Sequence, residues 1–176
     1  MPLCALQTLI DNGMSADKVR DICEDLLASG STDDERGLVL LAYLREQGNN
    51  THPEEVEEAR YGDNTFEVGR CEYRVLTDDE ADDAALEYIE ESLWAFNAEF
   101  LAGQTNLPVE VFTALADQCE GANDAILAII KQTCGLNDFV ADAVSADGRG
   151  HFLGQYDGDE GEIRIGGTDY YIYRNN

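Results

Sequence analysis

Positive charge is what this sequence has least of. Its 176 residues include 11 Lys and Arg against 37 Asp and Glu, which gives a net charge of −26 and an isoelectric point near 4.1. Only Lys18 and Lys131 are lysines. Such a chain repels nucleic acid and anionic membranes and is attracted to basic surfaces. We therefore expect a basic protein surface as its partner, with no direct contact to nucleic acid or membrane.

Long apolar runs and paired cysteines are also missing. No stretch approaches 18 apolar residues, and the first residues, MPLCALQTLIDNG, lack the cationic segment of a secretory signal, so we expect a cytoplasmic protein. The cysteines are five in number, widely spaced and without a CxxC pair. We expect most of them to be buried free thiols, since a free cysteine packs as a small apolar residue. They are Cys4, Cys23, Cys71, Cys119 and Cys134.

The chain nevertheless has the composition of a folded protein. Apolar residues make up 44%, with eight Tyr, six Phe and one Trp. Disordered acidic tails lack such aromatic residues, and a chain of this length can bury a core.

The first third of the sequence has the periodicity of helices. In residues 15–30 an apolar face recurs at helical spacing, with Ser15 as N-cap and Gly30 as the stop. Residues 31–48 repeat this pattern, and a short acidic helix is expected to begin at Pro53. The turn-forming residues 61–65 then indicate a linker. We therefore predict an all-α N-terminal module over residues 1–61, with helical periodicity from Leu3 onward.

The remainder, residues 66–176, is predicted to be an α+β domain. Residues 66–76 alternate as in a β-strand, and Thr77 with Glu80 forms a capping box for a long helix from Asp78 to about Leu101. The end of the chain has the pattern of a hairpin that pairs with the strand before the long helix. Further helices are expected at residues 108–120, 123–133 and 136–146, and the hairpin strands at 160–165 and 168–174 around a Gly166-Gly167 turn.

The long helix has many acids and no cation to pair with them. No Lys or Arg occurs between Val75 and Ile130, whereas the helix begins with eight acids within about 20 Å of its axis. This spacing, about one charge per 2.5 Å, is comparable to the value of about 1.7 Å for duplex DNA. The sequence therefore predicts an acidic partner-binding face. Its predicted members are Glu54, Glu55, Glu57, Glu58, Asp78, Asp79, Asp82, Asp83, Glu87, Glu90, Glu91, Asp157, Asp159, Glu160 and Glu162.

Two simpler explanations for the acids compete with this one. Acids in the first helical turn complement the helix dipole, and an acidic helix face can simply be solvated. An ordinary solvated face, however, mixes signs and so avoids like-charge repulsion at i,i+4. Adaptation to molar salt also produces abundant acids with few lysines. Residues 1–61 have 13 acids and five bases and the remainder 24 and six, a difference too modest to decide.

Catalytic and metal-binding patterns are weak, so we expect no enzyme, cofactor or metal. His151 could in principle pair with Cys71, Cys119 or Cys134, but nothing in the sequence marks an activated thiol. The run DGDEGE offers oxygen ligands without EF-hand spacing, which favours an acidic turn. GRGHFLG follows a helix and has no Lys with Ser or Thr, so it is not a phosphate loop.

Several longer strings resemble a group of small acidic proteins encoded by tailed bacteriophages. They are EYRVLTDDEADDAALEYIEESLWAFNAEFL, CEGANDAILAII, GRGHFLGQYDGDEGE and YYIYRNN, and they cover about residue 70 to the end. The group has no catalytic residues to transfer, so the resemblance implies a context, the cytoplasm of a bacterial host cell. Such proteins are similar in kind to DNA-mimicking inhibitors of host defence enzymes, which is an analogy between classes.

These observations lead to one expected function and two alternatives. We expect a non-enzymatic DNA mimic that blocks a nucleic-acid-binding defence protein, of the antirestriction or anti-CRISPR type. The first alternative is an acidic interaction or scaffold protein of phage or halophile origin. The second is a metal- or thiol-dependent enzyme that uses His151. The sequence leaves the oligomeric state open, a dimer included.

Overall fold

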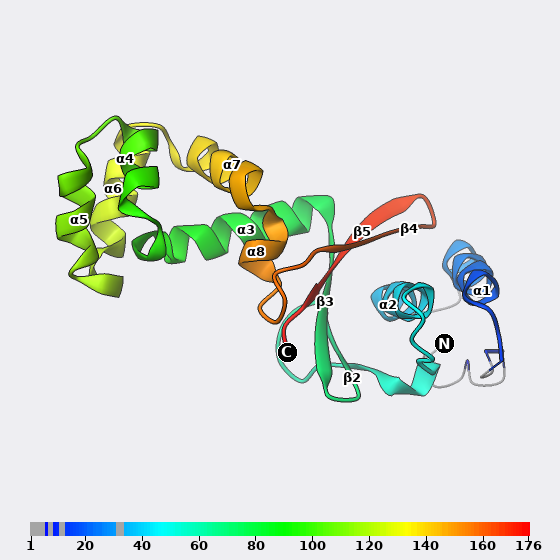
Figure 1. The fold of residues 1–176 in the computed structure, drawn as a ribbon. Coiled ribbons are helices and arrows are strands. Elements are labelled where there is room, and N and C mark those ends of the chain that lie inside the picture. Colours follow the sequence, from blue (N-terminus) through cyan, green and yellow to red (C-terminus); the bar gives the residue numbers. More distant parts are fainter. Residues whose placement is uncertain (1–5, 7–8, 11–12, 31–33) are drawn as a thin grey trace. The chain divides into compact units, whose positions relative to one another are not determined.

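The structure is a computed structural model that describes all residues except 1–5, 7–8, 11–12 and 31–33 (Figure 1). The described residues form eight α-helices and a five-stranded antiparallel sheet, which confirms the α+β class. The helical start expected at Leu3, and Cys4, lie outside the described residues. Among the described helices, none is both long enough and apolar enough to cross a membrane.

The contacts divide the chain into two compact units. The sheet unit contains residues 1–81 and 153–176, and the helical unit contains residues 82–152. This division differs from the expected boundary at residues 61–65. That segment joins two hydrogen-bonded strands, β1 (Val56–Glu58) and β2 (Thr65–Val68), so the chain on either side of it belongs to one unit.

The other strands are β3 (Cys71–Thr77), β4 (Gly161–Ile165) and β5 (Thr168–Arg174). The sheet has the strand order β1-β2-β3-β5-β4, and every neighbouring pair is antiparallel. The expected single strand over residues 66–76 is a hairpin of β2 and β3 that turns at Gly69 and Arg70. The C-terminal hairpin and its pairing with β3 are confirmed. Its tight turn requires positive φ at Gly166 and Gly167, which glycine adopts without strain.

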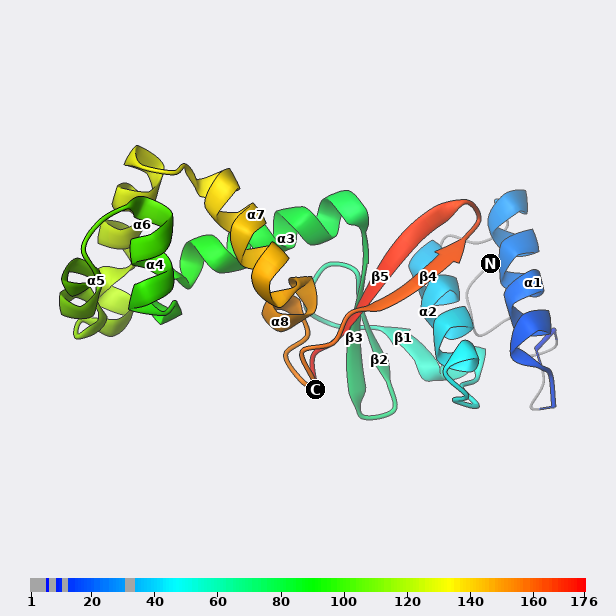
Figure 2. The ribbon, with the colours of Figure 1, turned by 45° about the horizontal axis from the view of Figure 1, so that its top comes forward.

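The two N-terminal helices pack against this sheet and are not a separate module. Helix α1 (Ala16–Ser29) runs from an extended Ser15 to a left-handed Gly30, as predicted, although the Ser15 side chain makes no capping bond. Helix α2 (Glu35–Glu46) is capped by Asp34, whose side chain accepts from the Gly37 N–H. In both views the helices lie to one side of the sheet (Figures 1 and 2). The shared core includes Val19, Cys23, Leu38, Leu41, Phe66, Val75, Ile163 and Ile172.

The prediction of an acidic helix that begins at Pro53 was wrong. Pro53–Glu55 form a single 3-10 turn, and Val56–Glu58 form strand β1. A helix of this length is marginal by itself and has few apolar side chains to bury. In the strand, Val56 is buried opposite Val68 and the backbone gains partners on β2. Pairing on the sheet therefore outweighs the helix-like pattern of the acids.

The helical unit consists of short helices around their own core. Helix α3 (Asp78–Glu91) begins in the sheet unit and continues into the helical unit. The elements are α3 (Asp78–Glu91), a 3-10 turn at Leu93–Ala95, α4 (Ala98–Thr105), α5 (Val109–Ala116), a 3-10 turn at Cys119–Ala122, α6 (Asn123–Gln132), α7 (Leu136–Asp147) and α8 (Arg149–Leu153). The buried side chains include Ile89, Leu93, Leu101, Phe112, Ile126, Ile130 and Phe139.

The long helix expected to reach Leu101 ends ten residues earlier. The Ser92 hydroxyl donates to the Tyr88 carbonyl, and Asn97 starts a new helix by accepting from the Glu99 N–H. Asn123 bridges the break, because its side chain donates to the Glu90 carbonyl (2.8 Å) and accepts from the Trp94 N–H (3.2 Å). One amide thus satisfies a donor and an acceptor that the helix end leaves open.

Candidate functional site: acidic surfaces and an aromatic pocket

The acids of α3 are not equivalent. Asp83, Glu87 and Glu91 are exposed and four residues apart, so they form one ridge with a rise of about 6 Å between neighbours. Asp79 occupies the preceding position of the same series and is exposed too. We call Asp83, Glu87 and Glu91 the acidic ridge. Within the described residues, no cation forms an ion pair with these three carboxylates.

Other acids of α3 have partners that are distant in the sequence. Lys131 Nζ lies 2.9 Å from Glu90 Oε1, and Arg149 Nη1 lies 3.0 Å from Asp82 Oδ1. The fold therefore brings cations to a helix whose own neighbourhood in the sequence has none. The uncompensated acids are about 6 Å apart along the axis, wider than the spacing of about 3.4 Å along one DNA strand. The acidic ridge alone therefore has a lower charge density than the eight acids of the helix taken together.

At the start of α3, the Glu80 side chain reaches back to Thr77, as predicted for one half of the capping box. Its carboxylate accepts from the Thr77 N–H and hydroxyl, and it also pairs with Arg36 at 2.8 Å. Partial burial opposes ionisation, but these hydrogen bonds and the Arg36 charge outweigh it and lower the pKa of Glu80. Glu80 is thus a structural acid. Asp78 and Asp79, also in this turn, are exposed where the helix dipole favours negative charge.

A second acidic feature lies on the sheet, and the sequence interpretation missed most of it. Glu57 on β1 pairs with Glu67 on β2, and Glu67 pairs with Glu72 on β3. Directly opposed side chains project from the same face, and adjacent strands are about 4.8 Å apart. We call Glu57, Glu67 and Glu72 the glutamate row. Because Glu67 and Glu72 are symmetric about the Gly69-Arg70 turn, a correctly placed hairpin would have predicted their pairing.

The remaining predicted acids are on the surface of the sheet unit. Glu54, Glu58, Asp157, Asp159 and Glu162 are exposed. Two others are exposed as well but form hydrogen bonds: the Glu55 carboxylate accepts from the His52 N–H, and Glu160 accepts from the Tyr173 hydroxyl. Asp157 also caps its own turn by accepting from the Asp159 N–H. These last contacts give the DGDEGE segment a local structural role as an acidic turn.

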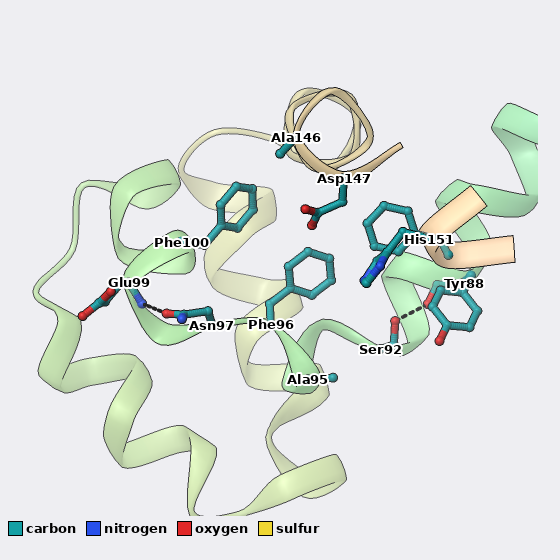
Figure 3. Close-up of a pocket in the computed structure, with 11 residues that line it drawn as sticks. Tyr88, Ser92, Ala95, Phe96, Asn97, Glu99, Phe100, Ala146, Asp147 and His151 are labelled. Atoms are coloured by element: carbon teal, nitrogen blue, oxygen red, sulfur yellow. Dashed lines mark hydrogen bonds between the residues drawn. The ribbon is translucent and has the colours of Figure 1, made fainter. Parts of the chain in front are cut away.

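The helical unit also contains a pocket that the sequence did not predict (Figure 3). Its volume is about 550 Å³, and its wall includes the rings of Tyr88, Phe96, Phe100 and Phe152. The stacked rings of Phe96 and Phe100 have centroids 5.8 Å apart, and those of Phe96 and Phe152 lie 6.1 Å apart. Leu93 and Leu101, from the same stretch of the sequence, are buried, whereas Phe96 and Phe100 line this cavity.

The polar groups of this pocket include one acid that faces inward. The Asp147 carboxylate points into the space between Phe96, Phe100 and His151, whereas Glu99 points away from it (Figure 3). His151 packs edge-on against Phe152 at 5.0 Å. No cysteine is among the described residues that line the pocket, so the Cys–His pair considered as an alternative does not form here. Among the described residues, no group of three or more His, Cys, Asp or Glu is placed to hold a metal ion.

The chain matches no family model, and neither the curated proteins nor the solved structures compared with it include a similar one. The resemblance to acidic phage proteins therefore stays a prediction.

Proposed function

We propose that the protein is a non-enzymatic inhibitor that occupies the DNA-binding surface of a bacterial defence protein, such as a restriction or CRISPR effector. The acidic ridge is the observation that carries this proposal. Its three carboxylates repel one another at i,i+4, and that repulsion costs a few tenths of a kcal/mol per pair. The fold supplies Lys131 and Arg149 to neighbouring acids of the same helix and leaves the ridge uncompensated. A basic partner would relieve this repulsion.

The glutamate row supports the same proposal from the sheet unit. Like charges directly opposed on neighbouring strands are destabilising, and ordinary sheets place opposite charges or uncharged residues there. Three glutamates on three adjacent strands are therefore a costly arrangement for the fold alone. Together, the ridge and the row offer regularly spaced negative charge on a helix and on a sheet. Lysine and arginine side chains that bind phosphates could pair with such charges.

The experiment is a plating assay in bacteria with an active restriction or CRISPR system. Cells that express the protein should plate a targeted phage at least about 100-fold more efficiently than cells without it, since an occupied DNA-binding surface cannot recruit DNA. The D83N/E87Q/E91Q variant should lose most of this gain, whereas D82N/E90Q, which removes acids already paired within the fold, should keep it. Equal protection by both variants would contradict a role for the ridge.

A second candidate function is an acidic interaction protein whose charge serves solubility at high salt. The observation that favours it is the even distribution of acids: the helical unit has 13 acidic and two basic residues, and the rest of the chain has 24 and nine. Salt adaptation requires that the fold weaken when counterions are removed. Urea unfolding at low salt and in molar KCl separates the two candidates. An inhibitor that works in an ordinary bacterial cytoplasm must be stable at the lower concentration.

A further inference from the structure

We propose that the aromatic pocket of the helical unit binds the ammonium or guanidinium head of an organic cation. This proposal concerns the pocket alone and does not depend on inhibition of a DNA-binding protein. The volume of about 550 Å³ lies in the usual range of small-molecule sites. The occupant is identified by the rings and the charge that surround this space.

The pocket wall presents aromatic rings from three helical segments. Tyr88 comes from α3, Phe96 and Phe100 come from the turn before α4 and from α4 itself, and Phe152 comes from α8. The Tyr88 and Phe152 rings lie 6.3 Å apart, so the rings form one connected set. The faces of aromatic rings are negative and attract cations, most strongly where water is excluded. Such a wall suits an alkylated cation, which is weakly hydrated.

The charge inside the pocket has the sign that a cation requires. Asp147 points into the space, and its carboxylate has no hydrogen bond or ion pair with any residue that the structure describes. None of the described residues that line the pocket is a Lys or an Arg. Asp147 is also the last residue of α7, where the helix dipole disfavours an anion and where the last turn contains no basic residue. Asp147 is exposed and has no partner among the described residues, so a bound cation would neutralise it without displacing an existing contact.

Other ligand classes fit these observations less well. An anion would meet Asp147 in a unit that already has 13 acids and two bases. A neutral apolar ligand would use the rings but would leave the Asp147 carboxylate partly desolvated without a partner. His151 lines the pocket beside Phe152. The cation class alone accounts for both the rings and the acid.

The test compares choline with its neutral isostere 3,3-dimethyl-1-butanol, using the full-length protein and proton NMR titration. Ring currents should shift the choline N-methyl signals upfield, and choline should bind at least about tenfold more tightly than the alcohol. A parallel titration with Nα-acetyl-arginine amide distinguishes the two possible sources of the bound cation. Tighter binding of this amide indicates a side chain of a partner protein, and tighter binding of choline indicates a free quaternary ammonium compound.

The matched variants are D147N and D142N, two acids of α7 of which only Asp147 lines the pocket. D147N should weaken choline binding by about fivefold to tenfold, as expected for loss of a charge beside the ligand, without changing that of the alcohol. D142N removes the same net charge and should leave both affinities unchanged. Three results would overturn the proposal: no binding of either cation, equal binding of choline and the alcohol, or equal effects of D147N and D142N.

Discussion

The side-chain ammonium group of Lys131 lies 2.9 Å from a carboxylate oxygen of Glu90, although 41 positions separate the two residues in the sequence. This pair, with Arg149 and Asp82, divides the acids of α3 into compensated and uncompensated groups. The division gives the first prediction. D83N/E87Q/E91Q should leave the free energy of unfolding unchanged or raise it by some tenths of a kcal/mol, because i,i+4 repulsion is relieved.

The paired acids should behave in the opposite way. D82N/E90Q removes two ion pairs and should lower the free energy of unfolding by up to about 1 kcal/mol per pair. Urea unfolding at low salt measures both variants, and added salt should reduce the difference between them. If the ridge variant is the less stable of the two, the ridge carboxylates have stabilising contacts and are not a strained surface.

Asn123 provides a test of the break between α3 and α4. N123A removes the acceptor of the Trp94 N–H and the donor to the Glu90 carbonyl, so we expect a loss of about 1–3 kcal/mol. Trp94 is the only tryptophan, and its fluorescence should report the change locally. N137A, at an exposed position of α7, is the matched control and should have little effect. Equal stability of the two variants would show that the bridge is dispensable.

Position 161 requires glycine because a larger side chain does not fit beside Tyr43. A Cβ atom at this position would overlap the phenol ring of Tyr43, so G161A should destabilise the sheet unit by about 1–3 kcal/mol. Gly103 lies in helix α4 with open space around it, and G103A should stabilise the protein by about 0.5–1 kcal/mol. Thermal unfolding of both variants measures the predicted loss of stability in G161A and the predicted gain in G103A. A neutral G161A would indicate that Tyr43 moves away at little cost.

The cysteines should differ widely in reactivity. Complete burial raises the pKa of the Cys23 thiol to about 12, whereas Cys119 is exposed. The reactive form is the thiolate, so at pH 8 iodoacetamide should modify Cys119 within minutes and Cys23 only after unfolding. Peptide mapping by mass spectrometry resolves the sites. Modification of Cys23 in the folded protein at a comparable rate would show that the core around α1 opens readily.

Much of the fold could be predicted from local patterns. The apolar faces of α1 and α2, the end of α1 at Gly30 and the C-terminal hairpin with its Gly166-Gly167 turn each depend on residues close in sequence. The failures occurred where distant contacts decide the structure. Val56 becomes part of a strand because β2 is available to pair with it, and α3 ends where Asn123 can satisfy its open backbone groups.

The candidate site shows the same limit. The acids of α3 were identified from composition and spacing, but the ion pairs that separate Asp82 and Glu90 from the ridge depend on residues 67 and 41 positions away. The glutamate row depends on hairpin register, which a one-residue error would reverse. The pocket brings together Phe96 and Asp147 from segments whose patterns individually predict only buried and exposed helix faces.

We expect the protein to compete with DNA for a basic surface on its partner. The most direct measurement immobilises the protein, exposes it to a nucleic-acid-depleted bacterial lysate at about 50 mM NaCl, where charge interactions are weakly screened, and elutes with duplex DNA. A parallel matrix contains the variant with D83N/E87Q/E91Q and E57Q/E67Q/E72Q. We predict that duplex DNA releases a nucleic-acid-binding protein which the variant does not retain. Retention of the same proteins by both matrices, without release by DNA, would contradict the account.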